Sequence, residues 1–333
     1  MVRKMIAALL AAMMVLCMAI SPAMAEEKEI HIVGTIFPIC DWVREIAGRD
    51  NARIKVTQLL DSGVDLHSFQ PTAADILNVQ NADLFVYVGG ESDGWVDDVT
   101  RVIVNPDWKS LSLVDAMGDA VKAEEIVEGM EHEHEHEHDD EDHEEHEHEE
   151  HEEEEEADEH VWLSLHNAQL LCRSLCDMLC EIDDVHAGEY RKNTEAYLEK
   201  LDALDQAYRE MTDKAAYHTV LFADRFPFRY LADDYGLTYF AAFSGCSAEC
   251  EASFQTIAFL AQKLDELGLP AVLTIENANV RIAETVISTS RDQSRPILTM
   301  NSMQAATSRD AEAGVTYLSL MEENLKVLEQ ALN

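Results

Sequence analysis

Short apolar runs alternate with longer amphipathic stretches along most of the chain. In the first half, residues 30–35, 53–60 and 84–88 are predicted to be strands, with a further strand at 102–105. Residues 38–48 are predicted to form a helix that a glycine closes. The second half repeats the pattern, with apolar runs at residues 219–223, 238–243, 271–275 and 297–300. Apolar strands alternating with helices predict parallel sheets covered by helices on both faces.

A long helical stretch separates the two halves. Residues 167–215 are rich in Leu, Glu, Lys and Ala, and residues 189–214 contain no proline or glycine. A continuous helix over the latter segment would be roughly 40 Å long at 1.5 Å per residue. The pattern predicts an α/β protein of two lobes with mainly parallel sheets, joined by a long rigid helix. Such an architecture commonly holds a ligand in the cleft between its lobes.

The start of the chain has the pattern of an export signal. A short basic start precedes an apolar run at residues 5–20, and residues 23–25 form a small-x-small cleavage site. The run is shorter than the roughly 20 residues that a membrane-spanning helix needs. We therefore expect an exported protein, in a periplasm or at the outer face of the cytoplasmic membrane. We also expect it to be a monomer. Leu16 is larger than the residue that normally precedes a lipidated cysteine, which argues against a lipid anchor at Cys17.

One segment differs from the rest in composition, because residues 131–156 are entirely Glu, Asp and His. A segment with nothing apolar to bury cannot offset the entropy lost on ordering, so we expect a disordered surface loop. The predicted parts of the chain are a signal peptide at 1–25, an N-terminal lobe at 26–165 that contains this loop, a connecting helical segment at 166–215 and a C-terminal lobe at 216–333.

The charge of the chain limits its partners. The formal net charge is −42, and residues 131–159 hold 20 Asp and Glu with no Lys or Arg. Such a surface repels nucleic-acid phosphates and attracts cations. We therefore expect a divalent metal ion rather than nucleic acid as the partner.

Eight histidines alternate with carboxylates in the acidic segment. Imidazole binds zinc, copper, nickel and iron, and the carboxylates add a strong negative field. The alternative, a solvated acidic linker with incidental histidines, fits poorly with eight histidines in twenty residues. We expect weak binding of metal ions at many places in this segment, by His132, His134, His136, His138, His143, His146, His148 and His151.

Two further histidines, His67 and His160, each lie at a junction between a loop and a predicted element. Alone, either is more often a satisfied polar residue than a metal ligand. Six cysteines follow the signal, and three of them are spaced by four residues on one helical face at 172, 176 and 180. Such a stripe is more often a set of small buried apolar residues than a soft-metal site.

Three stretches together resemble the substrate-binding proteins of zinc and manganese ABC transporters, the cluster A-I or ZnuA type. Residues 35–42, Thr-Ile-Phe-Pro-Ile-Cys-Asp-Trp, are similar to the first strand-to-helix turn of that family. Residues 63–75 resemble the stretch that contains its first metal histidine. Residues 158–163, Asp-Glu-His-Val-Trp-Leu, are similar to the Asp-Pro-His-x-Trp-Leu pattern around the second. A histidine-rich segment just before that pattern is typical of the zinc-binding members.

The resemblance implies that His67 and His160 are the first two metal ligands. Counting back from Tyr230 places Arg225 where the family usually has a His or Glu. Arginine keeps its proton and cannot bind a cation, so Asp224 is the nearest usable third ligand. The alternative role of Asp224 is a helix N-cap or an ion pair with Arg225.

The fourth ligand is left open by the sequence. Asn301 stands where the family often has an Asp, and an amide oxygen is a poor ligand for zinc. Water, Glu276 after the strand at 271–275, or Cys246 can complete the coordination instead. The other roles of these side chains are capping for Glu276 and packing for Cys246.

The resemblance implies reversible binding rather than catalysis. We expect an extracytoplasmic solute-binding protein that captures Zn²⁺ with high affinity and delivers it to the membrane permease of an ABC transporter. The alternatives are a family member that binds Mn²⁺ or iron, or an extracellular metal buffer or adhesin. Manganese prefers harder oxygen ligands, so the eight loop histidines favour zinc. The sequence shows no His-Glu-x-x-His motif, nucleophile elbow or phosphate loop, so we expect no enzymatic activity.

Overall fold

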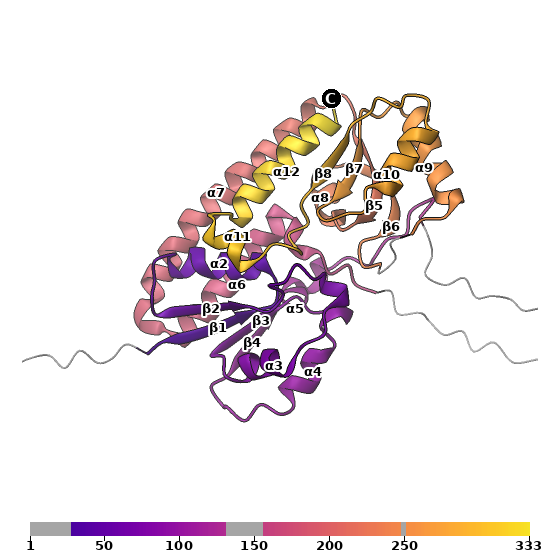
Figure 1. Ribbon diagram of the computed structural model, residues 1–333. Coiled ribbons are helices and arrows are strands. Elements are labelled where there is room, and N and C mark those ends of the chain that lie inside the picture. The colour runs from indigo at the N-terminus through magenta and orange to yellow at the C-terminus, as the bar shows by residue number, and fades with distance from the viewer. Residues whose placement is uncertain (1–27, 131–155, 248–250) are drawn as a thin grey trace, which may run out of the picture.

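The computed structural model describes residues 28–130, 156–247 and 251–333 (Figure 1). Two four-stranded parallel sheets lie in separate halves of this described part. The first sheet has the order β2-β1-β3-β4, with strands Ile54–Gln58, Ile30–Gly34, Leu84–Tyr87 and Lys109–Ser112. The second has the order β6-β5-β7-β8, with strands Thr238–Ser244, Thr219–Phe226, Val272–Ile275 and Ile297–Met300. The two α/β lobes with parallel sheets that the sequence predicts are therefore confirmed.

Strand β1 is central and nearly fully buried, as a parallel strand covered on both faces should be. It is followed by α2 (Phe37–Ala47), which has Pro38 in its first turn and ends at Gly48, where φ is 90°. The other elements of this half are α3 (Ala73–Gln80), α4 (Trp95–Thr100), α5 (Leu113–Met117) and the short 3-10 helices η1 (Leu66–Ser68), η2 (Glu91–Asp93), η3 (Gly118–Ala120) and η4 (Val161–Leu163).

The strand that the sequence predicts at residues 102–105 is not formed. That stretch is a surface turn in which the side chain of Val104 is 92% exposed. The fourth strand of the first sheet is Lys109–Ser112, which pairs in parallel with Leu84–Tyr87. The apolar residues at 102–105 were misleading because, in the described part of the chain, no strand pairs with them.

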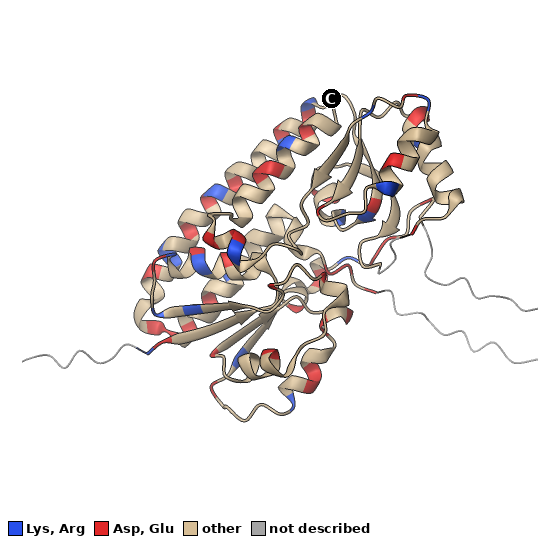
Figure 2. Cartoon of the chain, viewed as in Figure 1, with Lys and Arg blue, Asp and Glu red and all other residues tan. Residues whose placement is uncertain are grey.

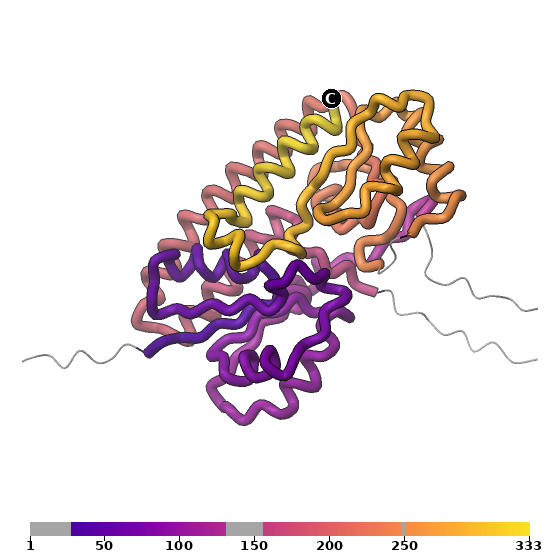
Figure 3. Tube along the Cα trace, viewed as in Figure 1, coloured from indigo at the N-terminus to yellow at the C-terminus, as the bar shows by residue number. Residues whose placement is uncertain are grey.

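Helices α6 (Leu165–Ile182) and α7 (Ala187–Lys214) pack together, joined by η5 (Asp184–His186). Helix α7 has 28 residues and is about 42 Å long at 1.5 Å per residue. It runs along both halves beside α12 (Tyr317–Ala331) (Figures 1 and 3). At one end Asn193 donates to the carbonyl of Ile46, and nearer the other end Tyr208 donates to that of Met321. The long helix is thus confirmed as a connection between the lobes.

The second half contains α8 (Arg229–Asp234), α9 (Phe254–Glu266) and α10 (Arg281–Thr289). Helix α11 (Ser308–Glu312) follows β8 but lies beside α2 of the first half, where Ser308 donates to Asp61 (Figure 1). A segment from earlier in the chain, residues 121–130, also packs on the second half (Figure 3). The amide of Lys122 donates to the Tyr230 hydroxyl at 3.0 Å, and the Tyr239 hydroxyl donates to Glu125 at 2.8 Å. The chain therefore crosses to the second half just before the acidic segment.

The surface of the described part is strongly acidic in places. Figure 2 shows acidic residues along the outer helices and along the segment that crosses between the halves. Among the helices of the described ranges, none has the combination of length and hydrophobicity that crossing a bilayer requires.

Candidate metal site

The two histidines singled out in the sequence face each other in the structure. His67 lies in η1, whose first turn is capped by Asp65, because the Asp65 carboxylate accepts from the His67 amide at 3.0 Å. His160 lies immediately before η4 and is fully buried. Their Nε2 atoms are 3.2 Å apart. Two nitrogens that bind one zinc ion at 2.0–2.1 Å in tetrahedral geometry would be separated by about 3.3 Å. The spacing therefore suits two ligands of a single ion.

Cys246 offers a third potential ligand atom from the other half of the molecule. Its sulfur and one ring nitrogen from each of His67 and His160 all lie within 4.8 Å of one another. Cys246 follows β6, and its amide donates to Glu124 at 2.8 Å. The preceding residue, Gly245, allows the close approach, since a Cβ there would lie 3.1 Å from the His160 ring. Two imidazoles and a thiol are donors that zinc prefers.

The other nitrogen of each imidazole is held by a hydrogen bond. The Asp158 carboxylate lies 3.0 Å from Nδ1 of His160 and also accepts from its amide at 2.9 Å. Nδ1 of His67 lies 2.8 Å from the Ser92 hydroxyl and 3.7 Å from the Glu159 carboxylate. A proton on Nδ1 of His160, donated to Asp158, leaves the Nε2 lone pair available to a metal ion.

Burial sets the protonation of His67 and Cys246. Burial lowers the pKa of His67 to about 3, and the neighbouring His160 adds to the effect. The His67 ring is therefore neutral near pH 7 and can bind a cation. Burial raises the pKa of the Cys246 thiol above its usual range, and the nearby Glu124 and Asp158 carboxylates raise it further. A metal ion must displace that thiol proton, so binding and proton release are coupled.

One side chain beside the site was missed by the sequence reasoning. Gln304 is 3% exposed, and its amide nitrogen lies 3.3 Å from Nε2 of His160. Its Oε1 has no hydrogen-bond partner among the described residues. Because the two ends of a glutamine amide are assigned rather than observed, the carbonyl oxygen can equally face the site. Its position three residues after Asn301, in the loop after a parallel strand, was the available signal.

The structure does not bring Asp224 to the paired histidines. Its carboxylate accepts from the amides of Arg225 at 2.9 Å and of Ile275 at 3.1 Å. Both oxygens are thus used within the second sheet, where they help join β5 to β7. Burial raises the pKa of Asp224, and these backbone hydrogen bonds oppose that effect.

Glu276 and Asn301 also lie apart from the three ligand atoms. The Glu276 carboxylate accepts from the amide and the hydroxyl of Ser302 at 2.6 and 2.7 Å. The Asn301 side chain accepts from the amide of Met303 at 2.8 Å. Both side chains stabilise the loop that follows β8, and that loop carries Gln304.

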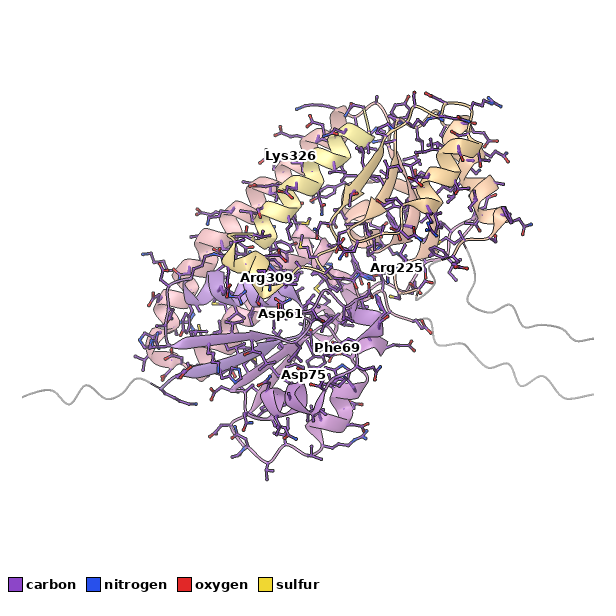
Figure 4. The ribbon with its side chains drawn as sticks, viewed as in Figure 1. Asp61, Phe69, Asp75, Arg225, Arg309 and Lys326 are labelled. Carbon is purple, nitrogen blue, oxygen red and sulfur yellow. The ribbon has the colours of Figure 1, made fainter. Side chains whose placement is uncertain are left out.

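Arg225 lies where the two halves meet (Figure 4). Its guanidinium forms an ion pair with Asp65 at 2.5 Å and donates to the carbonyl of Ser247 at 3.3 Å. Asp65 is the same residue that caps the His67 turn. Arg225 and Asp224 line a cavity of about 290 Å³ together with Asp65 and Glu276. The arginine therefore fixes the His67 turn from the second half instead of binding a metal.

Several predicted metal-binding residues cannot be placed. The eight histidines of the acidic segment lie outside the described residues, as does Cys17, which was considered for a lipid anchor and not for a metal. Cys172, Cys176 and Cys180 are buried in α6, as small apolar residues would be. The sulfurs of Cys176 and Cys180 lie 4.0 Å apart.

Two parallel-sheet lobes joined by a long helix, with a candidate metal site where they meet, define a metal-ion solute-binding protein. The chain belongs to the family described as zinc-uptake complex component A, periplasmic (ZnuA), whose profile matches residues 32–331. Members of this family are solute-binding proteins and not enzymes, as the sequence predicted. The periplasmic description supports the predicted location outside the cytoplasm.

The chain is similar to several characterised proteins. It is 31% identical over 319 residues to the zinc-binding lipoprotein AdcA of Streptococcus pneumoniae, covering 95% of this chain and 59% of that protein. It is 30% identical over 305 residues to the high-affinity zinc uptake system protein ZnuA of Bacillus subtilis, covering 91% and 88%. The Zn(II)-bound ZnuA-like domain of Streptococcus pneumoniae AdcA superposes with a TM-score of 0.69 at 27% identity, covering 91% and 99%.

The relatives also bear on the length of the chain and on the lipid anchor. The chain spans only about three-fifths of the length of the AdcA relative. That relative is also named a lipoprotein, so the argument against a lipid anchor at Cys17 is not borne out. The size of Leu16, on which the argument rested, is a weak criterion because it concerns a single position of the signal.

The hydrogen bond from Asp158 gives a testable prediction. Changing Asp158→Ala should weaken zinc binding by about 10- to 100-fold, because the His160 ring loses the carboxylate that orients it. A zinc titration in competition with a chelator measures the change. The variant Asp158→Asn keeps an oxygen acceptor and should lose less affinity. Equal affinity in the parent and in Asp158→Ala would show that the carboxylate does not support the ligand.

Proposed function

We propose that this protein is an exported, monomeric solute-binding protein that captures Zn²⁺ with high affinity and delivers it to an ABC transporter permease. The observation that carries the proposal is the convergence of His67, His160 and Cys246 within 4.8 Å at the junction of the two halves. Family membership and zinc-binding relatives in Streptococcus pneumoniae and Bacillus subtilis support it.

The donor set favours zinc over manganese. Two imidazole nitrogens and a thiolate sulfur are typical zinc ligands, whereas manganese prefers oxygen donors. The Gln304 amide oxygen or a water molecule completes a four-coordinate site. This ligand set replaces Asp224, Glu276 and Asn301, whose oxygens already accept backbone hydrogen bonds.

Binding is coupled to the arrangement of the two lobes. His67 and His160 come from the first half and Cys246 from the second, so one ion contacts both. An ion that binds one arrangement better than others shifts the population toward it. The permease recognises that arrangement and accepts the ion. Helix α7 limits the motion because it packs against both halves.

The acidic segment has an accessory role in this proposal, because its eight histidines collect zinc weakly and raise its concentration near the site. Replacing all eight histidines by asparagine in the full chain should leave one tight zinc site per chain and remove the weaker ones. Isothermal titration of parent and variant gives both stoichiometries. If the variant binds no zinc tightly, the protein is a metal buffer and the capture proposal fails.

A further inference from the structure

A second cavity opens directly onto the candidate metal site. It has a volume of about 270 Å³ and is distinct from the cavity beside Arg225. Two of the proposed zinc ligands, His67 and Cys246, form part of its wall. Among the described residues, the rest of the wall is strongly acidic and includes no Lys or Arg. Its carboxylates are those of Glu91, Glu124, Glu156 and Glu159.

These carboxylates come from separate segments of the chain. Glu91 begins η2, and Glu159 immediately precedes His160. Glu124 and Glu156 lie on two antiparallel segments, where the Glu124 amide donates to the Glu156 carbonyl at 2.7 Å. Glu91 and Glu156 are exposed, Glu124 is half-buried and Glu159 is buried. The negative charges therefore extend from solvent to the metal ligands.

One carboxylate oxygen of Glu159 has no hydrogen-bond partner among the described residues. The Glu159 side chain is 3% exposed, and its Oε1 accepts from the Ser92 amide at 2.9 Å. Its Oε2 makes no hydrogen bond to any residue in the described ranges and lies 3.7 Å from Nδ1 of His67. A buried carboxylate oxygen without a partner is costly, and a passing cation would supply the missing interaction.

The cavity beside Arg225 offers no comparable attraction. Both cavities contain carboxylates that accept from backbone amides, Asp224 and Glu276 in this one and Glu124 and Glu159 in the other. Here, however, Asp65 is also paired with the guanidinium of Arg225. A cation arriving there would also meet the fixed positive charge of Arg225. The electrostatic field therefore favours the cavity lined by the four glutamates.

We propose that this glutamate cavity is a transient divalent-cation subsite through which zinc reaches His67 and Cys246. The proposal rests on the proposed function, because the metal site is the destination of the ion. Carboxylate oxygens hold a partly hydrated ion weakly, and the nitrogen and sulfur donors inside then bind it more tightly. Glu156, which lines the cavity, is the last residue of the acidic segment and lies five residues after His151.

The first test measures the rate of zinc association with the full chain by stopped-flow fluorescence. The Trp162 ring lies 5.2 Å from the His160 ring and serves as the reporter. The variant Glu91→Gln, Glu124→Gln should bind zinc at least about fivefold more slowly and with a weaker dependence on salt. The control is Glu322→Gln, Glu323→Gln, which removes the same charge from an exposed stretch of α12. Equal slowing in both variants would overturn the proposal.

A steric pair of variants tests the route itself. Ala157 lines the glutamate cavity and Ala278 lines the cavity beside Arg225, and both are half-buried. Ala157→Phe should slow zinc association at least about fivefold by filling the passage, whereas Ala278→Phe should change it less than twofold. Similar rates in the two variants overturn the route. If Ala157→Phe does not fold, as judged by circular dichroism, the glutamate variants decide alone.

The two proposals fail in different ways. If the glutamate variants associate as fast as the parent while one tight site remains, the subsite is wrong and the capture function stands. If the parent itself has no tight zinc site, the proposed function fails first.

Discussion

Replacing His67 and His160 together with alanine should remove the tight zinc site from the chain. These residues supply two of the three side-chain ligands, and their Nε2 atoms lie 3.2 Å apart. The Cys246 thiolate alone cannot compete with water for the zinc ion. We therefore expect the zinc affinity to fall at least about 1,000-fold, roughly 4 kcal/mol. Isothermal titration in competition with a chelator measures a loss of this size. The comparison is cleanest in the chain whose eight loop histidines are replaced by asparagine.

The matched control removes two other histidines from the same chain. His166 and His218 are exposed and lie outside the candidate site. The variant His166→Ala, His218→Ala should keep one tight site with unchanged affinity. If the His67→Ala, His160→Ala variant also keeps that site, the tight ligands lie elsewhere in the molecule. Asp65, Asp224 and Glu276 around the other cavity would then be the next residues to change.

The architecture was predictable because its signals are local. Buried parallel strands give short apolar runs, as at Ile30–Gly34 and Val272–Ile275. The long helix Ala187–Lys214 follows from a stretch almost free of helix breakers. The strand predicted at 102–105 was wrong, because an apolar run forms a strand only where another strand pairs with it.

The ligand set was only partly predictable, because it depends on contacts between distant segments. His67 and His160 could be proposed from their surrounding motifs, and the structure brings them together. Counting residues from Tyr230 suggested Asp224, but the count cannot show that backbone amides already occupy its oxygens. Cys246 was one of several alternatives. Its approach to the histidines depends on how the second half packs against the first.

The thiol of Cys246 should leave a spectroscopic signature. Co²⁺ bound in place of zinc should show intense thiolate-to-metal charge-transfer absorption in the parent chain. The variants Cys246→Ser and Cys246→Ala should lose that absorption and bind zinc at least about 100-fold more weakly, because a direct ligand is removed and losing even a residue that supports a ligand costs about 10- to 100-fold. Both variants should fold, because Cys246 lies at the edge of the cavity and outside the hydrophobic core. A cobalt complex without the absorption in the parent would exclude the thiolate as a ligand.

The same residue should set the pH dependence of binding. Burial and the Glu124 and Asp158 carboxylates raise the pKa of the Cys246 thiol, so it is protonated near pH 7 without metal. Because zinc binds the thiolate, each ion releases one proton, and the apparent affinity should rise about tenfold per pH unit between pH 6 and 8. His67 adds little to this slope, since its pKa of about 3 leaves it neutral throughout. Titrations in buffers of different ionisation enthalpy measure the released proton. Cys246→Ala should flatten the slope, and an unchanged slope would mean that the proton comes from another group, with Gln304 or water in the third position.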